Sequence, residues 1–236
     1  MKIYCTVSPV FEENCYIVVN DKNQALIVDP GAYTKKMIDM LMEDINAEPK
    51  SILLTHGHLD HIWDAGKFNI PTYIPKPDMY RLDDPYQHFG EEIARNFRIL
   101  ANEEFVPIKN IQPLPDETYT TAFEIIDGFF LRGIPTPGHT EGSSIFLFSC
   151  EIEDYTARGI KNEHNLYAFG GDVIFASSVG RTDLPGGDRT QMLQSLRTIC
   201  NIVDPRTIFL TGHGIPTALW YEKENNSHIK YAMKMG

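Results

Sequence analysis

Four side chains that can bind a metal ion fall within six consecutive positions, at His56, His58, Asp60 and His61. They follow the apolar segment Ser51–Leu54, whose composition predicts a buried β-strand. Rigid strand ends commonly carry functional side chains, and such a concentration of imidazole and carboxylate groups has little structural use without a metal ion. The sequence therefore predicts a metal centre at the end of a core strand.

A similar arrangement recurs three times further along the chain. In each case a short apolar strand is predicted, and a histidine or an aspartate follows it with a glycine alongside. These positions are His139 after Phe129–Ile134, Asp172 after Tyr167–Phe169, and His213 after Thr207–Leu210. Because glycine allows the backbone to pack closely around an ion, we expect all three residues to join the first cluster.

The complete predicted ligand set has five histidines and two aspartates: His56, His58, Asp60, His61, His139, Asp172 and His213. Neutral imidazole and carboxylate suit zinc, iron or manganese, and zinc is the metal we expect. Seven ligands are enough for two divalent ions with positions left open, and Asp172 is the predicted bridge. Two ions lower the pKa of a water held between them, so the centre is predicted to be hydrolytic, with Asp60 and Asp172 as its catalytic carboxylates.

Hydrophobic periodicity predicts two similar halves built from strands and helices. The first half opens with an antiparallel meander and continues through a helix at Tyr33–Ile45 to the strand Ser51–Leu54, while the second half includes a helix near Arg189–Ile202. The strands predicted in addition to those above are Lys2–Val7, Cys15–Val19, Ala25–Val28, Ala122–Ile126 and Ser143–Ser149. Two sheets that pack together and carry helices outside give an α/β (α+β) fold, a four-layer αββα sandwich.

The length of 236 residues, 42% of them hydrophobic, fits a single domain spanning 1–236. Two segments are predicted insertions, near 75–117 and 150–164. The first contains one or two helices around Glu91–Leu100 together with several aromatic residues. Because long loops in compact domains are commonly functional, we expect this insertion to cover part of the metal centre.

Acidic residues outnumber basic residues by 32 to 21, which gives a formal net charge of -11. Such a surface repels a phosphate backbone, so we expect no nucleic-acid partner. The N-terminus lacks the apolar run of a signal peptide, and no segment approaches the length of a membrane span. We therefore expect a cytoplasmic protein with a small-molecule substrate and no membrane contact, and the oligomeric state stays open.

At these residues the chain resembles the metallo-β-lactamase superfamily, through an HxHxDH motif followed in order by His139, Asp172 and His213. The resemblance extends from Asp29 to His213 and implies the αββα fold with a metal centre. It also implies that Asp29, in the segment Val28-Asp29-Pro30-Gly31, supports the metal ligands from behind. An aspartate that merely forms a turn before proline has the same sequence signature.

Within that superfamily the chain is most similar to the short bacterial glyoxalase II proteins, which are hydroxyacylglutathione hydrolase-like. The segments that carry this likeness are Gly171-Asp172-Val173-Ile174-Phe175 and Gly180-Arg181-Thr182-Asp183-Leu184-Pro185-Gly186-Gly187-Asp188. The likeness implies that a metal-bound hydroxide hydrolyses a thioester such as S-lactoylglutathione. Only 23 residues follow His213, too few for the C-terminal helical domain that helps longer glyoxalase II enzymes to bind glutathione. Arg181 is the candidate substrate-binding cation, with an ion pair to Asp183 as its alternative role.

Other activities remain open for the same residues. Persulfide dioxygenases share the fold, the HxHxDH motif and the GRTD segment, but hold one iron, here with His56, His139 and Asp172. Lactonases and other acyl hydrolases of the fold are a further alternative. The β-lactamases of the best-known subclass place cysteine where this chain has Asp172, which argues against antibiotic hydrolysis.

Overall fold

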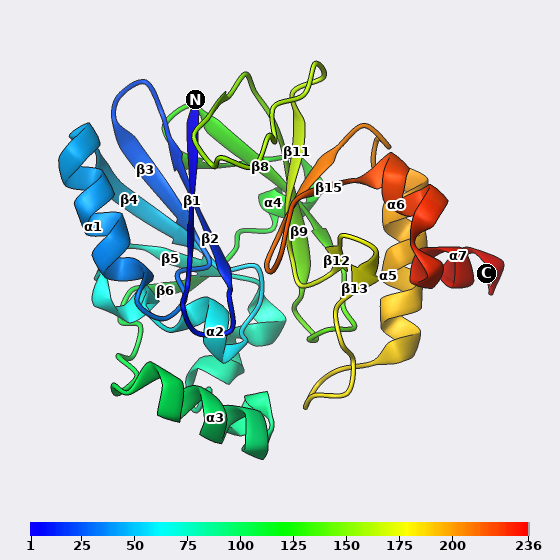
Figure 1. Cartoon of the computed structure of the whole chain (residues 1–236), viewed down its shortest axis with the longest axis horizontal. Coiled ribbons are helices and arrows are strands. Elements are labelled where there is room, and N and C mark those ends of the chain that lie inside the picture. Colours follow the sequence, from blue (N-terminus) through cyan, green and yellow to red (C-terminus); the bar gives the residue numbers. More distant parts are fainter. Residues whose placement is uncertain (236) are drawn as a thin grey trace.

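Two β-sheets pack face to face at the centre of the molecule, and helices cover both outer faces (Figure 1). The computed structural model describes residues 1–235. Helix α1 (Thr34–Ile45) lies outside the first sheet, and α5 (Arg189–Ile202), α6 (Leu219–Asn225) and α7 (Ser227–Lys234) lie outside the second. The predicted four-layer αββα sandwich is confirmed.

The first sheet has seven strands in the order β10-β1-β2-β3-β4-β5-β6. Its N-terminal part is the predicted antiparallel meander, since β2 pairs in antiparallel fashion with both β1 and β3. Strand β3 pairs with β4 in parallel, and α1 makes the crossover between them. The strand bounds are β1 Lys2–Val7, β2 Asn14–Val19, β3 Gln24–Val28, β4 Glu48–Leu53, β5 Thr72–Ile74, β6 Ile111–Pro113 and β10 Glu153–Asp154.

The second sheet has six strands in the order β15-β14-β11-β9-β8-β7. Strands β11 and β14 are parallel, with α5 in the crossover between them, and the other pairs are antiparallel. Strands β12 and β13 form a separate hairpin. The bounds are β7 Phe123–Ile126, β8 Phe129–Pro135, β9 Ser144–Ser149, β11 Leu166–Gly171, β12 Ile174–Phe175, β13 Ser178–Val179, β14 Ile208–Thr211 and β15 Thr217–Ala218.

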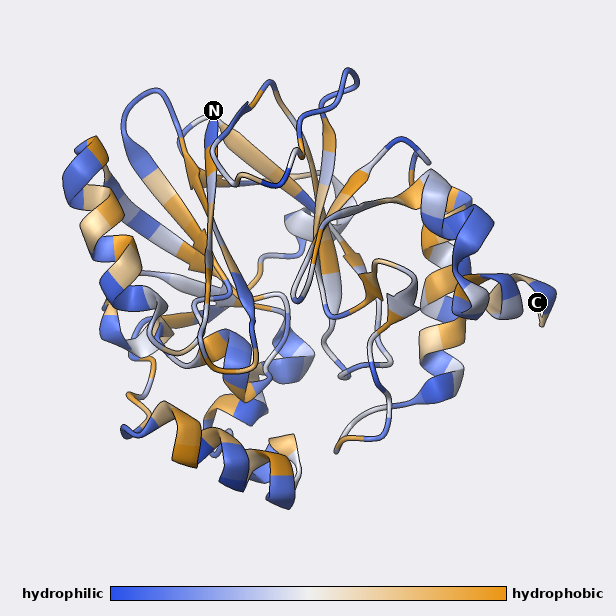
Figure 2. Cartoon of the chain, in the orientation of Figure 1, coloured by the Kyte–Doolittle hydropathy of each residue, from blue (hydrophilic) through white to orange (hydrophobic). Residues whose placement is uncertain are grey.

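Apolar clusters fill the three spaces between the four layers. Because successive side chains of a strand point to opposite faces, Val18 on β2 packs between the sheets whereas Ile17 packs toward α1. Ile38 of α1 joins the outer cluster of the first sheet, and Leu196 of α5 joins that of the second. Figure 2 shows the result, with apolar residues concentrated in the strands and mixed with polar ones along the helices. Each fully buried aliphatic side chain contributes about 1.5–3 kcal/mol to folding.

The two ranges predicted as insertions carry edge strands as well as loops. Range 75–117 holds several helical segments and, near its end, β6, which pairs in parallel with β5. Range 150–164 holds β10, which pairs in parallel with β1 at the opposite edge of the first sheet. The short helical segments of this part of the chain and its surroundings are α2 Leu59–Ile62, η1 Ala65–Lys67, η2 Lys76–Leu82, η3 Gln87–Phe89, α3 Glu91–Ala101 and α4 Glu117–Thr120.

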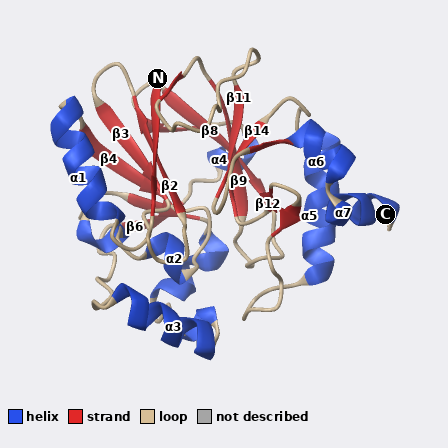
Figure 3. Ribbon diagram, viewed as in Figure 1, coloured by secondary structure: helices blue, strands red, loops and turns tan. Residues whose placement is uncertain are grey.

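The helices α6 and α7 at the C-terminal end are additional to the sequence-based expectation (Figure 3). The side chain of Asn226 separates them and caps α7, because it accepts hydrogen bonds from the backbone N–H groups of His228 and Ile229. Ile229 and Ala232 are buried in the cluster that α5 forms with the second sheet. Among the helices within residues 1–235, none combines the length and the apolar character needed to cross a membrane.

Candidate metal centre

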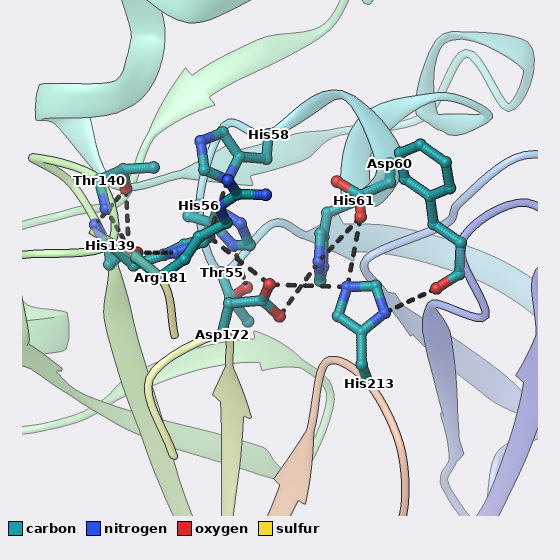
Figure 4. Close-up of polar contacts among 12 residues, drawn as sticks. Thr55, His56, His58, Asp60, His61, His139, Thr140, Asp172, Arg181 and His213 are labelled. Carbon is teal, nitrogen blue, oxygen red and sulfur yellow. Dashed lines mark hydrogen bonds and ion pairs between the residues drawn. The ribbon is translucent and has the colours of Figure 1, made fainter. Parts of the chain in front are cut away.

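Four strand ends meet at one edge of the two sheets and bring the seven predicted ligands together (Figure 4). In chain order these are His56 and His58 after β4, Asp60 and His61 in the short helix α2, His139 after β8, Asp172 after β11 and His213 after β14. The neighbouring glycines allow this approach. A Cβ atom at Gly212 would collide with the Asp172 carboxylate, and one at Gly171, whose φ is +47°, would collide with Thr55.

Three of the histidines lie together and are called the three-histidine group: His56, His58 and His139. One ring nitrogen of each lies within 4.8 Å of the other two. His58 Nδ1 lies 2.7 Å from His139 Nε2, so these two nitrogens face one another. All three side chains are almost completely buried. Three convergent imidazoles of this kind are typical of a zinc site.

Asp60, His61 and His213 form a second set, which we call the mixed group. Their ligand atoms also lie within 4.8 Å of one another. His213 Nε2 lies 3.2 Å from Asp60 Oδ2, and His61 Nε2 lies 3.9 Å from the same oxygen. His213 keeps 26% of its side chain exposed, which leaves this group open on one side.

The carboxylate of Asp172 lies between the two groups. Its Oδ2 is 3.5 Å from His139 Nε2 in the three-histidine group and 3.5 Å from His213 Nε2 in the mixed group. Its Oδ1 is 3.3 Å from His61 Nε2. This position is the one expected of a carboxylate shared by two metal ions.

The residues present fit a pair of metal ions. Buried polar atoms of folded proteins almost always have a hydrogen-bond partner. Here several buried atoms of the proposed ligands have none: His56 Nε2, His61 Nε2, Asp60 Oδ1 and Asp172 Oδ1. Metal coordination would satisfy all of them, and the donors are the nitrogen and oxygen ligands that zinc, iron and manganese accept.

Groups behind the ligands fix the orientation of the histidine rings. Asp29 lies where the resemblance predicts: it accepts hydrogen bonds from the backbone N–H and the hydroxyl of Thr55, and its Oδ2 is 3.1 Å from His61 Nδ1. His139 Nδ1 donates to the carbonyl of Arg181 at 2.8 Å. Such contacts on the far ring nitrogen leave Nε2 free for a metal.

The carbonyl of Phe11 holds the last histidine in the same way, because His213 Nδ1 lies 2.9 Å from it. The chain adopts a left-handed backbone at Phe11, with φ of +63°. A bulky residue rarely takes this conformation, so tertiary contacts stabilise it here. The loop before β2 therefore takes part in building the centre.

The two ligand groups differ in protonation. The pKa values of all three members of the three-histidine group are lowered, mainly because burial disfavours the charged imidazole. Burial acts in the same direction on the histidines of the mixed group, but the carboxylates of Asp172 and Asp60 outweigh it. They raise the pKa of His61 well above its usual range and that of His213 to about 9.

Sequence reasoning missed Glu13, a carboxyl group buried under the mixed group. Its side chain is fully buried and neither oxygen has a hydrogen-bond partner. Burial raises its pKa well above the usual range, and Asp29 and Asp60 add to the effect while His61 opposes it. In the sequence, the pair Glu12-Glu13 is typical of an exposed turn. The only feature that indicates a buried Glu13 is its position directly before a buried strand.

Sequence reasoning also missed Asp78 in η2, which joins two of the ligand loops. Its carboxylate accepts hydrogen bonds from the backbone N–H of Gly57 at 2.7 Å, the Thr140 hydroxyl at 2.7 Å and the backbone N–H of Gly142 at 2.6 Å. Buried Arg81 lies beside it, with Nε 3.4 Å from Asp78 Oδ1. Nothing in the sequence around Asp78 distinguishes it from other acidic residues.

A cavity of about 520 Å³ opens onto the ligands. Besides His58, Asp60, His139, Asp172 and His213, its walls are formed by Phe11, Phe89, Ile93, Phe175, Ser178, Val179, Arg181 and Leu184. Phe89 and Ile93 belong to the range 75–117, so the expectation that this range covers part of the centre is confirmed. The cavity has the size and the largely apolar lining typical of a small-molecule site.

Arg181 borders this cavity and is paired with Asp183. Its Nε and Nη2 donate to the two carboxylate oxygens at 2.7 Å each, while half of the arginine side chain stays exposed. The ion pair lowers the pKa of Asp183 to about 2. Arg181 thus makes the ion pair with Asp183 that was predicted as its alternative role. Its side chain also lines the cavity.

Comparison with known proteins agrees with this geometry. The model of the family described as the metallo-β-lactamase superfamily matches residues 8–159. The chain belongs to the metallo-β-lactamase superfamily. It is 32% identical to the hydroxyacylglutathione hydrolase GloC of Haemophilus influenzae. The alignment has 230 residues and covers 93% of each protein. The chain is therefore a metallo-hydrolase of this superfamily.

Two solved structures are also similar to this chain. The BLEG-1 B3 metallo-β-lactamase is 30% identical with a TM-score of 0.72, and the match covers 96% of this chain and 99% of that one. The di-iron-bound form of TTHA1623 is 25% identical with a TM-score of 0.71, covering 95% of this chain and 98% of that one. The histidine and aspartate groups are consistent with the binuclear metal site typical of the superfamily fold.

Proposed function

We propose that the chain is a thioester hydrolase with two divalent metal ions, and that these ions are zinc. The observation that carries the proposal is the position of Asp172 between two complete ligand groups whose buried donor atoms lack other partners. The three-histidine group would hold one ion, the mixed group the other, and Asp172 both. Bound there, the ions would supply a water of lowered pKa and polarise the substrate carbonyl.

The histidines around Asp172 would keep its carboxylate ionised. Burial favours the neutral form of Asp172, but His213 and His61 outweigh it and hold the pKa of Asp172 well below its usual range. We assign Asp172 and Asp60 the catalytic role of orienting the attacking water, since both line the cavity. Asp29 would keep the His61 ring in place from behind.

The lining of the cavity supports a thioester over an ester or a lactone. A thiol has a pKa of about 8.5 and leaves as a thiolate, whereas an alcohol needs a proton as it leaves. Apart from the proposed metal ligands, the cavity-lining residues within 1–235 include no histidine, carboxylic acid, lysine or tyrosine that could deliver that proton. The likeness to GloC, whose name states hydroxyacylglutathione hydrolysis, points to the same bond.

A persulfide dioxygenase is the second candidate, because His56, His139 and Asp172 alone could hold one iron. The mixed group favours the two-metal hydrolase, because Asp60, His61 and His213 bring a second set of ligand atoms within 4.8 Å of one another. Iron as the native metal would be compatible with a two-metal centre, because the similar TTHA1623 structure is a di-iron-bound form.

The test is an assay of protein loaded separately with zinc, iron and manganese. Thiol release from S-lactoylglutathione and from simple acyl thioesters is followed by a thiol reagent, and oxygen uptake is recorded with glutathione persulfide. We expect thiol release that a chelator abolishes, without oxygen uptake. Oxygen uptake on the persulfide without thioester cleavage would favour the dioxygenase, and faster turnover of a chromogenic β-lactam than of any thioester would favour a lactamase.

A further inference from the structure

Apolar rings flank the metal ligands on both sides of Asp172. The ring of Phe89 has its centroid 5.2 Å from that of His58, in the three-histidine group. The ring of Phe175 has its centroid 6.1 Å from that of His213, in the mixed group. A substrate whose carbonyl lies near Asp172 therefore meets an aromatic ring toward either end of the centre.

Further apolar side chains continue these walls. Phe11 packs on Phe89 with a ring-centroid distance of 6.2 Å, and Ile93, Val179 and Leu184 complete the lining. All of them except Phe89 are only partly buried, so they keep surface that a ligand can cover. Covering such surface stabilises a bound apolar group.

The cavity offers little to a negatively charged group. Apart from the ligand histidines, Arg181 is the one cationic side chain among the cavity-lining residues within 1–235. Asp183 already occupies two of its N–H donors and balances its charge. A carboxylate in the part of the cavity beyond the metal ligands loses hydration without gaining an unpaired cation.

We infer that the site is built for an uncharged thioester that carries apolar groups on both its acyl side and its thiol side, in preference to a glutathione thioester. This inference rests on the proposed thioester hydrolysis and names its substrate class. Glutathione brings two carboxylates, and the hydroxyl of a lactoyl group has to lie against phenyl rings. An uncharged, apolar thioester avoids both costs.

Four thioesters test the inference in a two-by-two design. The acyl group is lactoyl or isobutyryl, which replaces the hydroxyl by a methyl group, and the thiol is glutathione or the uncharged N-acetylcysteamine. With zinc-loaded protein we expect kcat/KM to be highest for isobutyryl-N-acetylcysteamine and lowest for S-lactoylglutathione, with a difference of about tenfold or more.

One substitution should release the charge of Arg181. Asp183→Asn removes the carboxylate that pairs with it, so kcat/KM for the glutathione thioesters should rise several-fold relative to the uncharged pair. The matched control is Asp204→Asn, which opens a similar exposed pair between Asp204 and Arg206 away from the cavity. The control should leave all four rates unchanged.

A second substitution tests the apolar wall. Leu184→Ser should lower kcat/KM for isobutyryl-N-acetylcysteamine more than for S-lactoylglutathione, whereas Leu100→Ser, at an exposed leucine of α3, should change neither. A preference for S-lactoylglutathione, or a ratio unchanged by Asp183→Asn, would overturn the inference and leave the hydrolase proposal standing. Failure to cleave all four thioesters would instead overturn the proposed function itself.

Discussion

At the residue scale, Asp172 is the side chain on which both ligand groups depend. It is within 3.5 Å of histidines from each of them. We expect Asp172→Ala to lose both metal ions and to lower kcat/KM at least about 100-fold, because even residues behind a metal ligand contribute 10- to 100-fold.

The control for that substitution is Cys200→Ala, in the buried side of α5 away from the centre. Metal content measured by elemental analysis and the rate of thiol release should both stay at the wild-type level in this control. Full metal occupancy in Asp172→Ala would show that Asp172 is not the shared ligand.

The histidine pKa values predict different proton release for the two metal sites. At pH 7 the three-histidine group is neutral because its pKa values are lowered, so it binds a metal without losing protons. In the mixed group His61 and His213 have raised pKa values, the latter about 9, so both must lose protons first.

Zinc titration of metal-free protein by calorimetry in buffers of different ionisation enthalpy measures this release. The first equivalent should bind nearly independently of pH between 7 and 9, and the second should tighten as the pH rises toward 9. Equal proton release for both equivalents would contradict the assignment of the two groups.

Arg181 is expected to hold its loop instead of binding an anion. Arg181→Ala should lower kcat/KM for charged and uncharged thioesters by the same factor. It should change the free energy of unfolding by only about 0–1 kcal/mol, because the pair with Asp183 is exposed. A loss confined to anionic thioesters, measured by steady-state kinetics, would restore the anion-binding role.

Residue identity alone predicted which side chains the fold would bring together, because four metal-binding side chains in six positions have few other uses. The same reasoning could not find Glu13 or Asp78. Each is a single acidic residue whose role comes from neighbours distant in the chain, such as Thr140 beside Asp78. Nor could it decide between the two roles of Arg181, since the pairing with Asp183 depends on loop conformation.

At the element scale, η2 acts as a clamp between the loop after β4 and the loop after β8. Asp78 supplies three short hydrogen bonds to these loops and is fully buried. Asp78→Ala leaves buried N–H groups without partners, so we expect a loss of at least about 3 kcal/mol in the free energy of unfolding.

Thermal and urea unfolding of the metal-free and zinc-loaded protein measure this loss. The matched control is Asp83→Ala, an exposed aspartate directly after η2, which should change stability by less than about 0.5 kcal/mol. Equal stability of the two variants would show that the clamp does not hold the loops.

Elements with a clear hydrophobic pattern were predicted correctly. The helix at Arg189–Ile202 has the predicted bounds, and the N-terminal meander differs by one residue at the start of β2 and of β3. The edge strands β6 and β10 span two or three residues, too few for an alternating pattern. Their pairing depends on the tertiary position of β5 and β1, which the local sequence does not contain.

At the scale of the whole molecule, both halves contribute side chains to the metal centre, because each sheet carries part of the ligand set. The first sheet supplies His56, His58, Asp60 and His61 from the segment that follows β4 and enters α2. The second sheet supplies His139, Asp172 and His213 from three strand ends. Neither the three-histidine group nor the mixed group is complete within one half, because each takes one histidine from the second half. Metal binding should therefore stabilise the packing of the two halves as well as the site.

The metal content of the purified protein after reconstitution with zinc and removal of the excess tests the central claim most directly. Elemental analysis should give two equivalents per chain, since both ligand groups are complete and share Asp172. A value of one equivalent that does not rise with added zinc, iron or manganese would contradict the two-metal account and leave a mononuclear centre in its place.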